Sequence, residues 1–276
     1  MLDQMVVIYC FCDEILKTLK FKDDLQCKMT TAEVMTFSLM SAMIFGGNYR
    51  ISRLMAMYYR FFPKVLSHSQ LIRRIHSISD EIWFFVFKAL QVILQQEGCQ
   101  HFIVDSFPIK TYETHKSFRA ENFKGKQYHG YSASKKQYYF GIKVHMVIDS
   151  RGVPIEFSIT PGSMSDIRSL KNFSLDLPKG SILMGDKAYT NYQFEDDLCN
   201  LDGIIMLVKR KRNLKRQNNK DDEQLLKNER NYIETVFSSI VSRMPRHIRA
   251  RTEKGFCLKI FLFILAYMFN LYFPLG

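Results

Sequence analysis

The feature that most constrains the fold is a strictly alternating segment near the middle of the chain. Apolar side chains occupy every second position, at Phe140, Ile142, Val144, Met146 and Ile148. A period of two places them on one face of an extended strand, so the segment predicts a β-strand with one buried face. The turn at residues 150–152 follows, and residues 153–159 are expected to return as the antiparallel partner strand.

Strands and helices are expected to alternate around this hairpin. Short apolar runs predict further strands at residues 101–104, ending in Asp105, at 181–184, followed by Gly185 and Asp186, and at 204–208. Helices are expected from Asp166, over 192–199, over 222–242 and near the C-terminus. This order describes an α/β architecture, a mixed sheet flanked by helices. It is the order of a ribonuclease H-like fold, in which the first and fourth strands are neighbours.

Residues 1–98 predict helices instead. Thr30 and Glu33 form a capping-box pattern ahead of the apolar run at residues 34–45, which two glycines end. Ser69 is expected to cap a short helix, and Asp80 to start another that reaches about residue 96. We therefore expect a small all-α N-terminal domain at 1–98 and the mixed-sheet domain at 99–276.

The short helix at residues 67–78 carries Arg73 and Arg74 and has two interpretations. A short helix with arginine on one face fits a DNA groove, as in a helix-turn-helix. It fits the solvated basic face of a small bundle equally well. The sequence leaves both open.

The charge balance restricts the partners of the chain. Its formal net charge is +12, from 39 Lys and Arg against 27 Asp and Glu. A protein this basic is typical of polyanion binders, with nucleic acid and an anionic membrane surface as the two candidates. The six cysteines form no C-x-x-C pair, so we expect reduced thiols in a cytosolic protein and no cysteine metal site.

The apolar run from Phe256 to Leu275 has the length of a membrane span. Lys259 interrupts it and Pro274 ends it, which favours a buried terminal helix. A membrane anchor remains the alternative, and cell fractionation would decide between them. Asp3 and the lack of a basic region before the first apolar run argue against a secretory signal.

Three acidic residues fall at matching places in the expected sheet. Asp105 and Asp186 end neighbouring strands, where ligands bind in open α/β sheets, and Glu234 lies on the long helix after the last strand. Clustered carboxylates repel each other unless cations neutralise them, and oxygen ligands favour Mg²⁺ or Mn²⁺. Two such ions can clamp a phosphodiester. A surface charge or a helix cap explains each acid alone, but three acids at matching positions favour a metal site.

Five segments of the chain stand out as motifs, namely Ile103–Pro108, Tyr139–His145, Thr160–Asp166, Gly185–Tyr189 and Arg230–Glu234. Their order and spacing, over about residues 100–265, resemble the catalytic domain of bacterial insertion-sequence DDE transposases. Arg249–Thr252 and Gly255–Phe256 resemble insertion-sequence family 982 in particular.

The resemblance implies Mg²⁺- or Mn²⁺-dependent cleavage at transposon ends, followed by attack of the freed 3′-hydroxyl on target DNA. Asp105, Asp186 and Glu234 would be the catalytic metal ligands. Arg230, one helical turn before Glu234, would hold a phosphate or orient Glu234. Lys227 and Val241 depart from the Tyr and Lys that relatives often carry, which leaves the phosphate-binding role of this helix and the activity of this copy open.

Basic residues lie on both sides of the Glu234 helix. The candidate DNA contacts are Arg73, Arg74, Lys187, Lys209, Arg210, Lys211, Arg212, Lys215, Arg216, Arg230, Arg249 and Arg251. Between Lys110 and Lys143, basic residues mix with aromatic ones, a pattern that fits backbone contact and stacking on unpaired bases. Those aromatic residues are Tyr112, Phe118, Phe123, Tyr128, Tyr131, Tyr138 and Tyr139. A basic run is usually a solvated face, but its placement here favours DNA.

The expected partners are therefore transposon-end and target DNA, bound by a homodimer or higher oligomer in the cytoplasm on the nucleoid, without a membrane. Two other functions stay open. A ribonuclease H-like nuclease would cleave without joining strands, and an inactive transposon relic would bind DNA without cleaving it. Other acids are expected to be turn or surface residues, with Asp166 the least certain; they are Asp149, Asp166, Glu195, Asp196 and Asp197.

Overall fold

The computed structural model describes residues 2–95, 98–112, 122–132 and 136–274. Its contacts divide the chain into two compact units, one combining Met1–Leu94 with Ser239–Gly276 and the other comprising Gln95–Ser238. The prediction of a single domain at 99–276 differs from this division, because the C-terminal helix belongs with the N-terminal helices.

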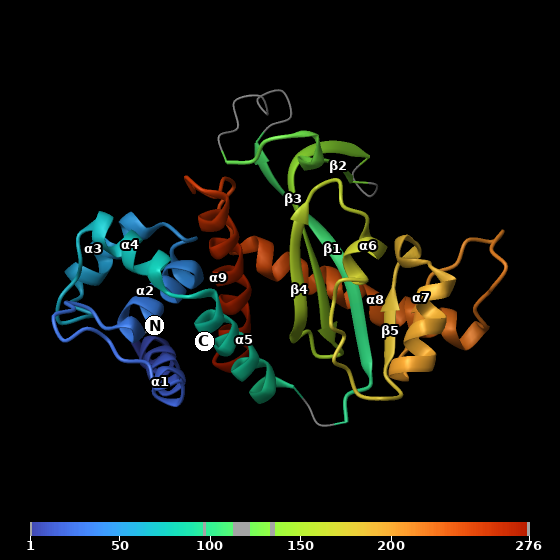
Figure 1. The fold of residues 1–276 in the computed structure, drawn as a ribbon, viewed down its shortest axis with the longest axis horizontal. Coiled ribbons are helices and arrows are strands. Elements are labelled where there is room, and N and C mark those ends of the chain that lie inside the picture. Colours follow the sequence, from blue (N-terminus) through green and yellow to red (C-terminus); the bar gives the residue numbers. More distant parts are fainter. Residues whose placement is uncertain (1, 96–97, 113–121, 133–135, 275–276) are drawn as a thin grey trace. The chain divides into compact units, whose positions relative to one another are not determined.

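The central unit is built on one mixed sheet (Figure 1). Its described strands are β1 (His101–Tyr112), β2 (His129–Ser132), β3 (Gln137–Asp149), β4 (Pro154–Pro161), β5 (Ile182–Gly185) and β6 (Ile205–Val208). β3 pairs antiparallel with both β1 and β4, whereas β5 runs parallel to β1 and β6 parallel to β5. The main order is thus β4-β3-β1-β5-β6, with β2 paired to the first residues of β3. The predicted mixed α/β class and the pairing of the first predicted strand with the fourth are confirmed.

Helices cover both faces of this sheet. On one face, α6 (Asp166–Leu170), η3 (Lys187–Tyr189), α7 (Tyr192–Asp197) and η4 (Leu198–Asp202) contribute to a core with the strands. On the other, α8 (Lys220–Ser242) places the Phe237 ring 4.6 Å from that of Phe107. The prediction of one buried face for β3 is therefore wrong, since even His145 and Asp149 are buried between the two helix layers.

β1 is longer than its sequence pattern predicts. The expected strand stops at Asp105, but β1 continues to Tyr112 because it pairs with β3 along this length. Its parallel neighbour β5 ends at Gly185. Asp105 therefore lies within a paired strand, at the level where that strand loses its second neighbour.

The other unit is a helical bundle. Its described helices are α1 (Leu2–Thr18), α2 (Thr31–Ile44), α3 (Tyr49–Tyr58), α4 (His68–Ser77), α5 (Asp80–Leu94) and α9 (Glu253–Tyr272). The predicted capping box before α2 is present, with the Glu33 N–H donating to the Thr30 hydroxyl and the Thr30 N–H donating to the Glu33 carboxylate. Ser67, and not Ser69, caps α4, because Ser67 forms a capping box with Gln70.

α9 is long and apolar enough to cross a membrane, and 61% of its most apolar window is buried within the protein. Lys259 interrupts this helix with its charge satisfied internally. Its Nζ donates to the carbonyls of Gly47 at 3.2 Å and Arg249 at 2.7 Å and lies 4.7 Å from the centre of the Tyr49 ring. A helix that is apolar all round needs neighbours on every side, and contacts with α2 and α5 provide them. These contacts support a core helix.

The close approach of β1 and β3 at Gly141 leads to a stability prediction. A Cβ at this position would overlap the carbonyl oxygen of Ile109 and lie 3.0 Å from the backbone nitrogen of Thr111. We expect Gly141→Ala to lower the free energy of unfolding by about 2–4 kcal/mol, measured by urea denaturation. Gly180→Ala is the control, since no atom lies within 4 Å of its Cβ and only its φ of +84° is unfavourable. Equal losses in both variants would contradict this interpretation.

Candidate active site

Asp105 and Asp186 are brought together by strand register. His101 pairs with Ile182, and the parallel register continues to Ile103 and Met184. Two residues further along, the same register places Asp105 beside Asp186. Neighbouring strands lie about 4.8 Å apart, and residues in register share a face of the sheet. Both side chains therefore point to the face that α8 covers.

The local sequence around Asp186 explains how it is held. A Cβ at Gly185 would lie 3.2 Å from the Tyr189 ring and equally close to a methyl group of Val104. The missing side chain lets Tyr189 fold back beneath the strand, where it is fully buried. The Asp186 carboxylate accepts the Ala188 N–H at 2.7 Å and so starts η3. This short turn directly after β5 fixes the carboxylate at the strand end.

Arg230 on α8 bridges the two carboxylates. Its Nη2 lies 3.7 Å from Asp105 Oδ2 and 4.0 Å from Asp186 Oδ2. The other oxygen of Asp105 accepts the N–H of Ser106 at 2.8 Å. Two neighbouring carboxylates favour a cation between them, because it relieves their mutual repulsion. The pair thus has the donor set and the charge that suit a hard divalent ion.

The environment of Asp105 disfavours its charged form. Burial raises the pKa of its carboxyl to about 6, against an ordinary value of 3.8. The Ser106 N–H and the Arg230 charge lower this pKa, while the negative charges of Asp186 and Asp166 raise it. A carboxylate kept in such surroundings is typical of functional sites.

Glu234 is placed differently from the two aspartates. It lies four residues after Arg230, on the same side of α8 and about 6 Å further along, and it is exposed to solvent. Among the described residues, no group of three His, Cys, Asp or Glu side chains lies close enough to hold a metal ion. The structure thus brings together Asp105, Asp186 and Arg230, without Glu234.

Asp166 is a residue whose role the sequence interpretation missed. It was expected to be a turn or surface residue, but its side chain is only 20% exposed and accepts a hydrogen bond from Ser106 at 2.7 Å. Its position at the end of the Thr160–Asp166 motif, which leads from the end of β4 to the start of α6, was the available signal.

Besides Arg230, three of the arginines expected at DNA form ion pairs within the chain. Arg74 contacts Asp23 at 3.0 Å. Arg210 and Arg216 form two-pronged pairs with Glu195 and Asp196, respectively. The Arg210 pair is nearly buried, so the prediction of Glu195 as a surface residue is wrong. Besides Arg216, the candidates with exposed side chains are Arg73, Lys187, Lys209, Lys211, Arg212, Lys215, Arg249 and Arg251.

The aromatic residues between Lys110 and Lys143 also divide into two groups. Phe123, Tyr128 and Tyr139 are buried and belong to the core. Tyr131 and Tyr138 are exposed and lie opposite each other on β2 and β3, with ring centres 4.9 Å apart. Phe118 and the side chain of Tyr112 lie outside the described residues.

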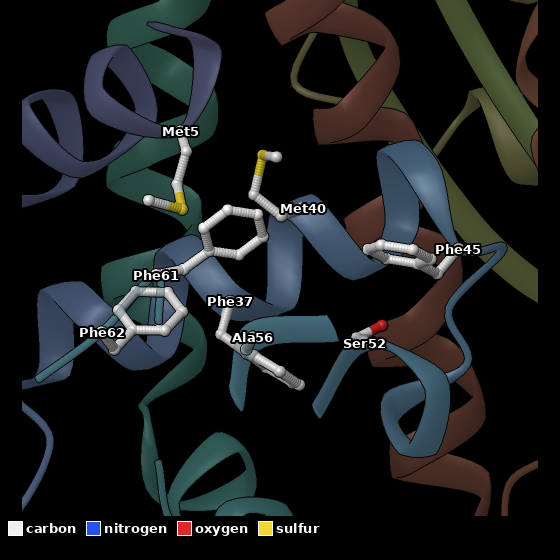
Figure 2. Close-up of a pocket in the computed structure, with 8 residues that line it drawn as sticks. All are labelled: Met5, Phe37, Met40, Phe45, Ser52, Ala56, Phe61 and Phe62. Atoms are coloured by element: carbon white, nitrogen blue, oxygen red, sulfur yellow. The ribbon is translucent and has the colours of Figure 1, made fainter. Parts of the chain in front are cut away.

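A pocket in the helical unit carries no comparable chemistry. Figure 2 shows its lining, which is apolar apart from Ser52. The Ser52 hydroxyl lies 2.8 Å from both the Ser41 hydroxyl and the Asn48 carbonyl oxygen, so its hydrogen-bonding capacity is already used. This pocket is a gap between core side chains, lined by Met5, Phe37, Met40, Phe45, Ser52, Ala56, Phe61 and Phe62.

Comparisons with known proteins agree with this fold. The profile of the transposase DDE domain family matches residues 97–269. Among solved structures, the fold is similar to that of piggyBac transposase in a synaptic complex with hairpin DNA, with a TM-score of 0.55 and 12% sequence identity. That similarity covers 96% of this chain and 71% of the piggyBac chain. No curated protein sequence matches.

The sheet order and the paired carboxylates define a ribonuclease H-like enzyme domain. The family match covers more than half of the chain, so the chain belongs to the transposase DDE domain family. It is a transposase, an enzyme that cleaves DNA and transfers strands. Membership of insertion-sequence family 982 stays a prediction.

The raised pKa of Asp105 predicts a pH-dependent stability. The Asp105 carboxyl group binds its proton more tightly in the folded protein than in the unfolded chain. Protonation of Asp105 therefore stabilises the folded state; this stabilisation is complete below about pH 4 and is lost as the pH rises towards 6. Asp105→Asn removes this loss. In the absence of metal we expect the variant to melt a few degrees higher than the wild type at neutral pH, with the difference disappearing at about pH 4.

Thermal melting across this pH range measures the effect. Asp202→Asn is the control, because Asp202 is exposed and should change little. An Asp105→Asn variant that melts at or below the wild-type temperature at neutral pH would contradict the role given to burial.

Proposed function

We propose that Asp105, Asp186 and Glu234 hold the divalent cations, Mg²⁺ or Mn²⁺, with which this transposase cleaves transposon ends and joins them to target DNA. The observation that carries the proposal is the in-register aspartate pair with a cationic group already lying between its members. Members of this family generally depend on divalent metal. Carboxylate oxygens at a strand edge match the ligand chemistry of these ions.

Each residue of the proposed site has its own role. Asp105 and Asp186 would hold the ions, which when bound would supply activation of the attacking oxygen and stabilisation of the leaving oxygen. Glu234 completes the ligand set from the same side of α8 as Arg230, and its exposed side chain is free to turn towards the carboxylates. Arg230 neutralises the aspartates before metal binds and contacts a DNA phosphate afterwards, since a guanidinium suits both kinds of oxygen.

The basic loop between β6 and α8, residues 209–219, is proposed to hold the DNA backbone. Its first residue, Lys209, continues the register that pairs Gly185 with Val208. Lys209 therefore lies beside Asp186 at the same edge of the sheet. Two ion pairs anchor this loop to α7, where Arg210 and Arg216 both lie over the Tyr192 ring. With the loop anchored, the exposed Lys211, Arg212 and Lys215 are available for phosphates.

The wider assembly is also a proposal. The piggyBac transposase with a similar fold is described in a synaptic complex with DNA, which supports DNA as the partner here. We propose transposon-end and target DNA as substrates and a homodimer or higher oligomer on DNA, acting in the cytoplasm on the nucleoid. Arg73 on α4 and the exposed Arg249 and Arg251 are proposed as further backbone contacts in the helical unit.

Substitution of the proposed ligands tests the metal site. We expect Asp186→Asn and Glu234→Gln to reduce Mg²⁺-dependent cleavage of transposon-end DNA by at least about 100-fold, because the ions lose a charged ligand. DNA binding in a gel-shift assay should change little. Strand transfer is followed in the same reactions by adding a target plasmid.

Each result of this assay has a defined meaning. Full cleavage by Glu234→Gln would remove Glu234 from the ligand set. Cleavage without any joined product in the wild type would instead indicate a nuclease without strand transfer.

The basic loop gives a second test. We expect Lys211→Ala together with Arg212→Ala to weaken binding to DNA of any sequence and to reduce the slope of log affinity against log salt by about one for each lost phosphate contact. Lys179→Ala is the matched control, because Lys179 is exposed but lies just before β5, at the opposite end of the strands from Asp186. An identical salt slope in the double variant and the wild type would exclude these two residues from the interface.

A further inference from the structure

A polar network lies on the face of the sheet opposite to the two aspartates. Asp166, at the start of α6, accepts hydrogen bonds through one oxygen from the Ser106 hydroxyl at 2.7 Å and from Lys143 Nζ at 3.3 Å. Lys143 also donates to the Met164 carbonyl at 3.1 Å. The proposed metal site uses none of these groups directly.

His145 completes the surroundings of Asp166. Its Nδ1 lies 3.5 Å from the same Asp166 oxygen, and its Nε2 is 2.9 Å from the Thr160 hydroxyl. Burial lowers the pKa of this histidine, so the ring is neutral at pH 7. The positive charge that balances Asp166 therefore comes from Lys143.

Ser106 connects this network to the proposed metal site. Successive residues of a strand point to opposite faces, so the Ser106 side chain reaches Asp166 while that of Asp105 points towards α8. The Ser106 N–H also donates to Asp105 Oδ1 at 2.8 Å. A single residue thus hydrogen-bonds Asp105 through its backbone and Asp166 through its side chain.

We infer that Asp166 is a positioning residue that acts through Ser106. By fixing Ser106 it fixes the N–H that orients the Asp105 carboxylate, and so it sets the geometry in which Asp105 and Asp186 share a divalent cation. The inference rests on the metal site proposed above. Hydrogen-bonded partners of metal ligands typically contribute on the order of 10-fold to 100-fold in metal affinity.

Direct ligation by Asp166 fits the contacts less well. Its Oδ1 already accepts two hydrogen bonds, one of them from an ammonium group. The side chain that it holds, Ser106, points away from the face that carries Asp105 and Asp186. Lys143 also neutralises its charge locally, which weakens its attraction for a second cation.

Binding of Mn²⁺ to the full chain without DNA, measured by isothermal titration calorimetry, tests the inference. We expect Ser106→Ala and Asp166→Asn each to weaken Mn²⁺ binding by on the order of 10-fold. The double variant should be about as weak as either single variant, because both remove the same connection. Ser106→Thr keeps the hydroxyl and should bind within about threefold of the wild type.

Ser158→Ala is the matched control for a purely structural effect. The Ser158 hydroxyl lies 3.0 Å from that of Ser169 and so ties α6 to β4, without a connection to Asp105. It should lower thermal stability about as much as Ser106→Ala does, because each variant removes one side-chain hydrogen bond, yet leave Mn²⁺ affinity unchanged. Equal losses of affinity in Ser158→Ala and Ser106→Ala would overturn the inference.

Asp105→Asn separates failure of the inference from failure of the proposed site. Loss of Mn²⁺ binding in Asp105→Asn with wild-type affinity in Ser106→Ala would overturn the positioning role alone. Complete loss in Asp166→Asn with wild-type affinity in Ser106→Ala would make Asp166 a direct ligand and also overturn that role. Wild-type affinity in Asp105→Asn would show that the proposed metal site itself is wrong.

Discussion

The parallel pairing of β1 with β5 is the constraint on which the catalytic unit depends. It places two carboxylates side by side at a partly buried edge, where their repulsion and lost hydration oppose ionisation. Arg230 offsets part of this cost from α8, so the charge of the aspartates and the position of the helix are linked. The packing of α8 over the sheet therefore also determines the electrostatics of the site.

Much of this arrangement follows from local patterns. The alternation from Phe140 to Ile148 identifies the central hairpin, and the order of strands and helices leads to the neighbouring aspartates. The full length of β1 could not be predicted, because its second half includes Ser106 and Pro108 and is stabilised by pairing with β3. The unit to which α9 belongs could not be predicted either, because a helix that is apolar all round does not indicate which core it packs into.

The basic residues show another limit of a single sequence. Arg210 and Lys211 are neighbours in the same basic run, yet one is paired with Glu195 and the other is exposed. The difference depends on α7, which packs beside the loop only in the folded chain. A charge run predicts an interface, whereas tertiary contacts decide which of its members fix the loop and which remain available to a ligand. Glu234 likewise lies on the expected helix, but its side chain is not gathered with the aspartates.

The missing side chain at Gly185 has a consequence for how this domain can change over time. The space that a larger residue would need there is filled by the Tyr189 ring and by Val104. A side chain at position 185 is therefore accommodated more readily once position 189 or 104 has become smaller, which makes the order of substitutions matter. Sequence change at the end of β5 is therefore coupled to change in the buried ring of Tyr189 that packs against it.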